Sequence, residues 1–538
     1  MDSMNWRENA VGPLGVGNVE GVGGMIGPGH ELWTDELSQI PDAVRQFLVY
    51  FCAKVREANV AEIHNLYEDT FNKLSNRYYK SDEWPLAEVI APLVESDEIF
   101  LMLYKELYFR HIHASSQPSL EQRLEAWENY CLLFNQFLNN RMLEFDLPQS
   151  WLWDIVDEFI YQFEDWSLYR SKLKNKSPEE IEFLQDSDHI WNVNSVLQYL
   201  HALVNQSNVC PWLLNGNEPV GSPNPTDNDF DLSSLALYRY IGYFSIIGLL
   251  RIHCLLQDYR LALMVLQPLD FDATNPLFTH VSACHVSLFY FMGFAFLMLR
   301  RYEDAVRVFS TTLMHIGRIK QYHTRSYQYD QINKRSEKML ALLALCFSFS
   351  PQSSEQASMG LLREKYSDKL ARLRAGEESL FEELFVFASP KFISPAPPNY
   401  EVTADSGMDC AKLQLHLFMN EVRQQLVLPQ IRSYLKLYRA ISLSKLASFM
   451  ETDETTFRSH LLSLKHKGWT IVGDRSDPPL LGSFRACTGV DFYIDNNVVH
   501  IADSDEGVNY GEFFLENIER LEDLMESIRI QNSTTRVK

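Results

Sequence analysis

The sequence lacks the cysteine patterns that mark common metal and redox proteins. Its eight cysteines stand singly among 538 residues, and no two form a CxxC pair, which excludes a zinc ribbon or a thioredoxin-type motif. Cys284 adjoins His285, and His111 is two residues from His113, but neither spacing places two ligands on one helical face. We therefore expect no metal centre, and the scattered cysteines are typical of a reducing compartment.

A membrane-spanning pattern is also missing. The longest apolar run, residues 287–299, has thirteen residues, whereas a helix that crosses a bilayer needs about 20. The glycine-rich start has no basic stretch followed by an apolar core, so it does not resemble a secretory signal. We expect a cytoplasmic chain with no membrane contact and with a disordered tail over residues 1–35.

Positive charge is scarce in this chain. It has 48 Lys and Arg against 71 Asp and Glu, a formal net charge of −23 at pH 7. This balance disfavours general binding to nucleic acid, because phosphates attract a local excess of Lys and Arg. We expect no DNA binding.

Two segments reverse the acidic balance. Residues 431–467 contain seven basic and three acidic residues, and residues 318–338 contain six basic and two acidic ones, interleaved with tyrosines. Solvated helix faces, protein-partner surfaces and weak RNA contacts share this pattern. The candidate residues for an RNA or partner contact are Arg318, Lys320, Arg325, Arg458, Lys465 and Lys467.

Catalytic motifs are absent as well, including the P-loop, the nucleophile elbow, the zinc-protease helix and the dinucleotide fingerprint. The stretch WLWDIVDEFIYQFEDW, residues 151–166, comes nearest, since paired carboxylates perform acid–base chemistry where an apolar pocket raises one pKa. Its apolar residues recur at helical spacing, however, beside Asp154, Asp157 and Glu158. We therefore expect an amphipathic helix with a solvated acidic side, and neither an enzyme nor a cofactor site.

Helical periodicity is what the sequence does contain. Residues 40–205 carry apolar side chains three and four positions apart almost without a break. A self-match at 43 residues then aligns DYRLALMVL with RYEDAVRVF, so that Tyr259 and Ala262 correspond to Tyr302 and Ala305. Such a period is typical of stacked helical hairpins of the tetratricopeptide type. Two amphipathic helices in an irregular α domain are the alternative.

Past residue 430 the pattern changes. Apolar residues mark three short helices near 431–438, 443–450 and 453–467. Residues 490–494 and 499–501 then alternate on either side of an Asp-Asn-Asn turn, which predicts a hairpin. Three helices followed by a hairpin are the element order of a winged helix.

The C-terminal segment carries a heptad seam of five apolar residues. They recur at spacings of four, three, four and three, and they are Phe514, Ile518, Leu521, Met525 and Ile528. Acidic residues dominate the flanks, so pairing with a second copy would bring like charges together. We expect a less acidic helix of another protein to cover this seam, with folding back onto its own domain as the alternative.

These patterns predict a mainly α fold: a right-handed helical-repeat (tetratricopeptide-like) solenoid, then a winged-helix module and a C-terminal helix. The chain divides into a glycine-rich tail 1–35, a helical domain 36–209, a linker 210–231, helical repeats 232–430, a winged helix 431–503 and a C-terminal helix and tail 504–538.

Helical hairpins that lead into a winged helix resemble the PCI domain, here over approximately residues 305–510. The stretches LYKELYFRHI, WLWDIVDEFIYQF, GYFSIIGLLRIH and VDFYIDNNVVHIADS are similar, in this order, to the subunit L family of eukaryotic translation initiation factor 3. The resemblance implies a non-catalytic scaffold subunit without a cofactor.

The resemblance also implies partners. These are PCI-type neighbours among the other subunits of the factor, a bundle of C-terminal helices, and the 40S ribosomal subunit, reached through the complex, in support of mRNA and initiator tRNA recruitment. Two alternatives stay open: a structural subunit of a proteasome-lid or signalosome-like PCI complex, and a protein that binds RNA directly.

Overall fold

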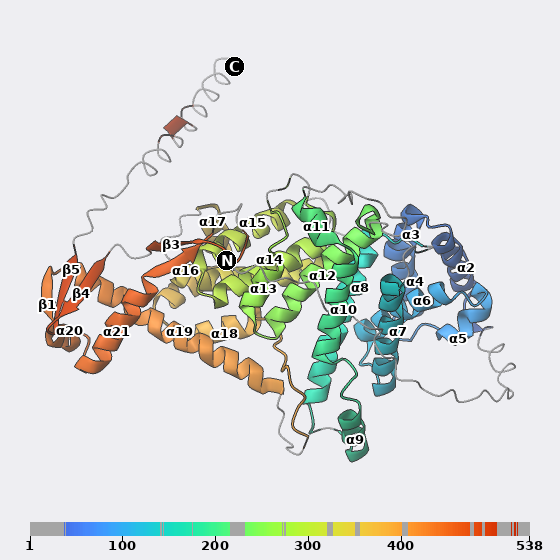
Figure 1. The fold of residues 1–538 in the computed structure, drawn as a ribbon, viewed down its shortest axis with the longest axis horizontal. Coiled ribbons are helices and arrows are strands. Elements are labelled where there is room, and N and C mark those ends of the chain that lie inside the picture. The colour runs from blue at the N-terminus through green and yellow to red at the C-terminus, as the bar shows by residue number, and fades with distance from the viewer. Residues whose placement is uncertain are drawn as a thin grey trace, which may run out of the picture.

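The computed structural model is elongated, with the first helices at one end and a small β-containing module at the other (Figure 1). It describes residues 37 to 502 and residues 518, 521, 522 and 525, without 38, 140–142, 144, 175, 216–231, 272, 274–275, 320–326, 350–355, 401–406, 474–477 and 487–489. Every regular element described before Ala440 is a helix, which confirms the mainly α prediction. The predicted tail 1–35 lies outside the described residues. Within the described part, no helix is both long and apolar enough to cross a membrane.

The first group of helical elements ends at Leu214. It comprises α2 (Asp42–Arg56), α3 (Val60–Asn65), the π-helix η1 (Leu66–Phe71), α4 (Asn72–Tyr78), α5 (Ala87–Ile90), the 3-10 helix η2 (Ala91–Val94), α6 (Glu98–Ser115), α7 (Leu120–Asn139), α8 (Gln149–Ser171), α9 (Pro178–Asp186), α10 (Val193–Gln206) and α11 (Val209–Leu214). Helix α11 occupies the start of the predicted linker 210–231, because Val209 and Trp212 are buried there.

The second group follows the predicted linker. It comprises the 3-10 helix η3 (Leu232–Ser234), α12 (Ala236–Leu255), α13 (Tyr259–Val265), the 3-10 helix η4 (Leu277–His280), α14 (Ser282–Met298), α15 (Tyr302–Ile319), α16 (Tyr327–Phe349), α17 (Gln356–Arg374), α18 (Glu378–Ala388) and α19 (Gly407–Leu435).

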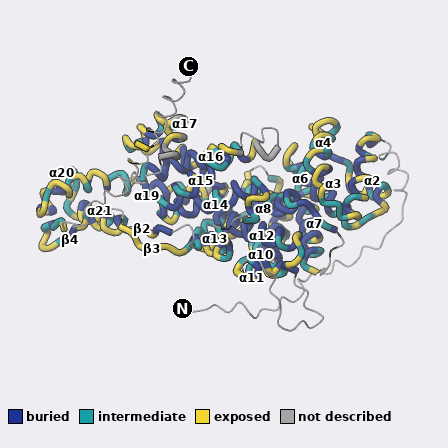
Figure 2. The backbone as a smooth tube through the Cα atoms, turned by 90° about the horizontal axis from the view of Figure 1, so that it is seen from above, coloured by how far each residue is buried: buried dark blue, intermediate teal, exposed yellow. Residues whose placement is uncertain are grey.

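The two groups share one hydrophobic core, which extends from Ile40 to Val422. The core fills the middle of the molecule, where most of the backbone in Figure 2 is coloured dark blue for buried residues. Arg251 of α12 adds polar links across it, with ion pairs of 2.7 Å to Asp157 and 2.8 Å to Glu164 of α8. The predicted parts 36–209 and 232–430 therefore pack as one helical body.

The 43-residue repeat is visible in the backbone. Helix α13 begins at Tyr259 and α15 at Tyr302. Each follows a left-handed residue, Gln257 with φ 69° and Arg300 with φ 62°, and these two are also 43 positions apart. The copies differ in length, since α13 has 7 residues and α15 has 18.

Close packing inside the second copy explains its small residue. A Cβ atom at Gly293 of α14 would lie 2.5 Å from a ring carbon of Phe309 on α15. Phe309 and Ala305 are both fully buried. A side chain at 293 would therefore push the two helices apart.

The C-terminal module has its own small core and an antiparallel sheet of strand order β1-β5-β4. Its elements are β1 (Ala440–Ser442), α20 (Leu443–Phe449), α21 (Glu454–Lys467), β2 (Trp469–Val472), β3 (Ser483–Ala486), β4 (Asp491–Asp495) and β5 (Val498–Ala502). Asn496 and Asn497 join β4 to β5 with φ of 44° and 62°, the two positive values that a two-residue type I′ turn requires. The predicted hairpin is therefore confirmed.

Two features of the module differ from expectation. No separate helix begins at 431, because α19 continues through Pro429 to Leu435. Leu428 and Ile431, which flank this proline, are buried in the core of the module, and that burial offsets the helical hydrogen bond that proline removes. The second difference is an unpredicted hairpin, β2–β3, which pairs apart from the main sheet.

Candidate functional site

The β2–β3 hairpin meets the helical body at the turn that precedes α15. Asp304, in the first turn of α15, is fully buried and accepts hydrogen bonds of 3.3 and 3.2 Å from the backbone N–H of Gly473. The same carboxylate pairs with Arg301 at 2.6 Å and with Arg307 at 2.7 Å. A buried carboxylate persists only when it is paired and hydrogen-bonded, so this cluster anchors Gly473 and residues 479–481 to the body. We call it the Asp304 junction.

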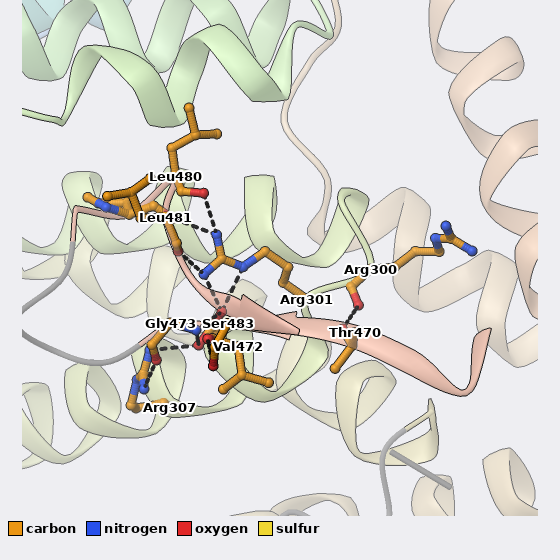
Figure 3. Close-up of polar contacts among 11 residues, drawn as sticks. Arg300, Arg301, Arg307, Thr470, Val472, Gly473, Leu480, Leu481 and Ser483 are labelled. Atoms are coloured by element: carbon orange, nitrogen blue, oxygen red, sulfur yellow. Dashed lines mark hydrogen bonds and ion pairs between the residues drawn. The ribbon is translucent and has the colours of Figure 1, made fainter. Parts of the chain in front are cut away.

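The two arginines of the Asp304 junction also bind backbone carbonyls of the hairpin (Figure 3). Arg301 donates to Pro479 at 2.6 Å and to Leu481 at 3.0 Å, and Arg307 donates to Gly473 at 2.7 Å. A Cβ atom at Gly473 would lie 2.7 Å from a guanidinium nitrogen of Arg301 and 3.2 Å from the carbonyl oxygen of Leu481. Only glycine lets the chain approach the guanidinium this closely.

Further contacts join the module to the body beside the Asp304 junction. The Lys467 ammonium at the end of α21 lies 2.7 Å from the Glu421 carboxylate of α19, and the Lys467 side chain is only 6% exposed. The Thr470 hydroxyl of β2 donates to the carbonyl of Arg300 at 3.3 Å. The contacts lie at separate points, so they resist rotation of the module on the body.

The sequence pattern gave little sign of this arrangement. Each strand of the unpredicted hairpin has four residues, too few for a clear alternation. The available signals were Gly473 and Gly482 on either side of the loop, and the run RYEDAVR with its basic–acidic–basic spacing. Neither signal predicts that Asp304 and Gly473, which are 169 positions apart, are in contact.

Helix α8 contradicts the expectation of a solvated acidic side, so that prediction is wrong. The Tyr67 hydroxyl donates to Asp154, and Arg110 of α6 contacts both Tyr67 and Asp154. Gln162 donates to Glu158 at 3.2 Å. The acidic side of α8 packs against α6 and α12, whose arginines supply the compensating charge.

Burial also perturbs the acids of α8. It raises the pKa of Asp154 to about 6 and the pKa of Glu158 to about 8, with Arg110 opposing both shifts. Neither carboxyl lines the cavity found between α14 and α15. No group of three or more His, Cys, Asp or Glu among the described residues is placed to hold a metal ion.

Two of the six basic candidates are engaged within the chain. Lys465 of α21 donates to the Asp491 carboxylate at 2.9 Å and to the carbonyl of Phe492 at 2.5 Å, which ties α21 to β4. Lys467 is buried in its pair with Glu421. These lysines therefore stabilise the module and its attachment.

The other two described candidates lie on different helices. Arg458 is exposed on α21, whereas Arg318 is exposed near the end of α15. Lys320 and Arg325 lie outside the described residues. Arg458, Lys465 and Lys467 therefore share α21, where the two lysines are engaged in ion pairs, whereas Arg318 lies on α15.

The C-terminal seam is described at three of its five positions. Ile518, Leu521 and Met525 are helical and 51%, 61% and 54% exposed. Phe514 and Ile528 lie outside the described residues. Apolar residues spaced by three and four on an exposed helical stretch are what a partner helix buries.

Comparison with known proteins finds a matching family model and relatives that align along most of this chain. A family model described as RNA polymerase I-associated factor PAF67 matches residues 122–521. Eukaryotic translation initiation factor 3 subunit L of Nematostella vectensis is 43% identical over 493 residues, covering 91% of this chain and 93% of that protein. The proteins of the same name from Danio rerio and Drosophila melanogaster are 42% identical, each covering 91% of this chain and 89% and 93% of their own length. The region matched by the family model contains α8 and the Asp304 junction.

Proposed function

Because the chain belongs to the family of eukaryotic translation initiation factor 3 subunit L, we propose that it is a non-catalytic scaffold subunit of that factor in the cytoplasm. Identity of 41–43% along about nine-tenths of the chain carries this proposal. In this role the chain supports the binding of the factor to the 40S ribosomal subunit and the recruitment of mRNA and initiator tRNA.

Residues 431–503 act as a winged helix, within a PCI module of approximately residues 305–510. The order of elements supports this assignment: the end of α19, then β1, α20, α21, β4 and β5, with β1 paired to β5. The β2–β3 hairpin is an insertion between α21 and β4. Its attachment at the Asp304 junction supports a module held in one orientation on the body.

The helical body acts as a right-handed, tetratricopeptide-like solenoid that spaces the interaction surfaces apart. The repeated left-handed turns at Gln257 and Arg300 support this assignment, as does the close approach of Gly293 to Phe309. Stacked hairpins present long surfaces to partners because each pair contacts mainly its neighbours.

Other subunits of the factor bind this chain through PCI-type neighbour contacts and through a bundle of C-terminal helices. The exposed seam residues Ile518, Leu521 and Met525 support the second contact. Direct RNA binding has little support, since Lys465 and Lys467 pair with Asp491 and Glu421.

Affinity purification tests this function. The chain carries an affinity tag at its N-terminus and is purified from cytoplasmic extract, with and without nuclease, and the associated proteins are quantified by mass spectrometry. We expect other subunits of initiation factor 3 and 40S ribosomal proteins, with the subunits retained after nuclease treatment. Proteasome-lid or signalosome subunits in their place would contradict the proposal, and so would an association that nuclease removes completely.

A further inference from the structure

A cavity of about 400 Å³ lies between α14, α15, the η4 segment and the loop of the β2–β3 hairpin. Its inner wall is apolar: Phe278, Met292 and Phe296 line it and are each less than 5% exposed. Pro479, on the hairpin side, also lines the cavity. Cavities of this size with apolar walls receive ligands or the anchoring side chains of partners.

The described residues at this cavity carry net positive charge, whereas the chain as a whole is acidic. Arg301, Arg307 and Arg318 line it, and none of its described lining residues is Asp or Glu. Asp304 pairs with two of these arginines. Among the described residues at the cavity, three guanidiniums therefore face one carboxylate, an excess of two positive charges. In a chain of net charge −23, such a local excess favours an anionic group at this place.

The cavity has a polar mouth and an apolar interior. Thr279, Thr311 and Arg318 are exposed at the mouth. Inside, the rings of His285 and His315 stack at 4.2 Å. Burial lowers the pKa of both histidines, so near neutral pH they add aromatic surface and no charge. An occupant therefore enters with its apolar end and leaves its anionic end beside Arg318.

We propose that this cavity receives an aromatic side chain of another subunit, from a segment that carries an Asp or Glu beside that aromatic residue. The choice of a protein segment rests on the function proposed above, a subunit of a multiprotein factor. An aromatic side chain fills the apolar interior, and the adjacent carboxylate pairs with Arg318 in a charge-assisted contact. Because one wall belongs to the β2–β3 hairpin, the occupant also strengthens the attachment of the module to the body.

Site-specific photocrosslinking in the assembled complex tests this proposal. The photoreactive residue p-benzoylphenylalanine replaces Thr311 at the mouth, the complex is purified and irradiated, and the crosslinked peptide is identified by mass spectrometry. Gly317, on the same helix but outside the lining, carries the same probe as a position control. We expect position 311, and not position 317, to crosslink to a subunit segment with an aromatic residue next to Asp or Glu.

Charge reversal at the mouth sharpens the test. Arg318→Glu should lower the yield from position 311 by about ten-fold, the loss expected for one charge-assisted contact. The matched control Arg363→Glu, at an exposed arginine of α17, should leave the yield unchanged. Both substitutions are at exposed side chains, and equal melting temperatures of the two variants establish that both fold.

Three results would overturn the proposal: equal yields from positions 311 and 317, a yield that Arg318→Glu leaves unchanged, or a small-molecule adduct in place of a peptide. The protein composition of the same sample reports separately on the proposed function. Factor 3 subunits without the crosslink count against the cavity alone. The expected crosslink within a proteasome lid counts against the factor 3 assignment alone.

Discussion

Asp304 and Gly473 are 169 residues apart in the chain, yet the buried carboxylate of the first accepts hydrogen bonds of 3.3 and 3.2 Å from the backbone N–H of the second. This contact joins the start of α15 to the loop of the β2–β3 hairpin. It fixes how the C-terminal module sits on the helical body, and with it the relative positions of the surfaces that we propose partners bind.

Substitution of Asp304 by Asn should release the hairpin. The change leaves Arg301 and Arg307 without a carboxylate, and removal of one partner from a buried ion pair costs about 3–5 kcal/mol. Amide hydrogen exchange at residues 470–473 should therefore become faster by about two to four orders of magnitude. Glu383→Gln, which alters an exposed pair with Lys369 at 4.0 Å, serves as the control and should change nothing. Unchanged exchange in the Asp304 variant would show that the hairpin is held in another way.

Two glycine substitutions compare a packed site with an open one. Gly293→Ala should destabilise the protein by about 1–3 kcal/mol, because the new methyl would lie 2.5 Å from the buried ring of Phe309. Gly317→Ala has nothing within 4 Å and should stabilise α15 by about 0.4–1 kcal/mol. Thermal unfolding of the two variants and the wild type measures the difference. A Gly293 variant as stable as the Gly317 variant would rule out tight packing between α14 and α15.

Glu158 should make stability depend on pH. Burial raises its pKa from 4.5 to about 8, so the folded chain binds a proton here that the unfolded chain releases between these values. The stability that the protonated Glu158 side chain contributes is therefore fully present below pH 4.5. As the pH rises from 4.5 to 8, the free energy of unfolding falls and this contribution is lost. Glu158→Gln has no carboxyl group to ionise, so its stability should not fall in this way. The melting temperature of the variant minus that of the wild type should therefore increase between pH 4.5 and pH 8. A constant difference between the two proteins from pH 5 to 8 would contradict the assignment.

The C-terminal seam should be needed for assembly but not for folding. Leu521→Asp places a charge on an apolar position that is 61% exposed, so the isolated chain should keep its melting temperature. A partner helix would have to bury that charge, so the variant should co-purify with less of the other subunits. Glu522→Gln, on the neighbouring exposed residue, is the matched control. Full assembly of the Leu521 variant, or its failure to fold, would contradict a partner-helix seam.

Local periodicity was enough to predict much of this fold. Helix starts at Tyr259 and Tyr302 and the Asn496–Asn497 turn follow from short-range pattern, because propensity and turn chemistry act over a few residues. The continuation of α19 through Pro429 was missed, because burial of Leu428 and Ile431 in a second core outweighs the local preference against proline.

Tertiary burial explains what the pattern could not give. The acids of α8 look like a solvated face in sequence, since their compensating charges come from Arg110 and Arg251 on distant helices. Lys467 likewise looks like a surface cation until Glu421 is placed beside it. The contacts at Gly473 depend on a fold that brings residue 304 to the same point, and no local signal carries that information.

Sedimentation of cell extract through a sucrose gradient tests whether this chain is a subunit of initiation factor 3. We expect this chain to sediment with the other subunits of initiation factor 3, with part of this pool in the 40S fractions. We also expect a larger share of the Leu521→Asp variant than of the wild type at the top of the gradient as a free, folded chain, while the Glu522→Gln variant stays with the factor. A wild-type chain that sediments apart from every factor 3 subunit would show that it is not a subunit of that factor.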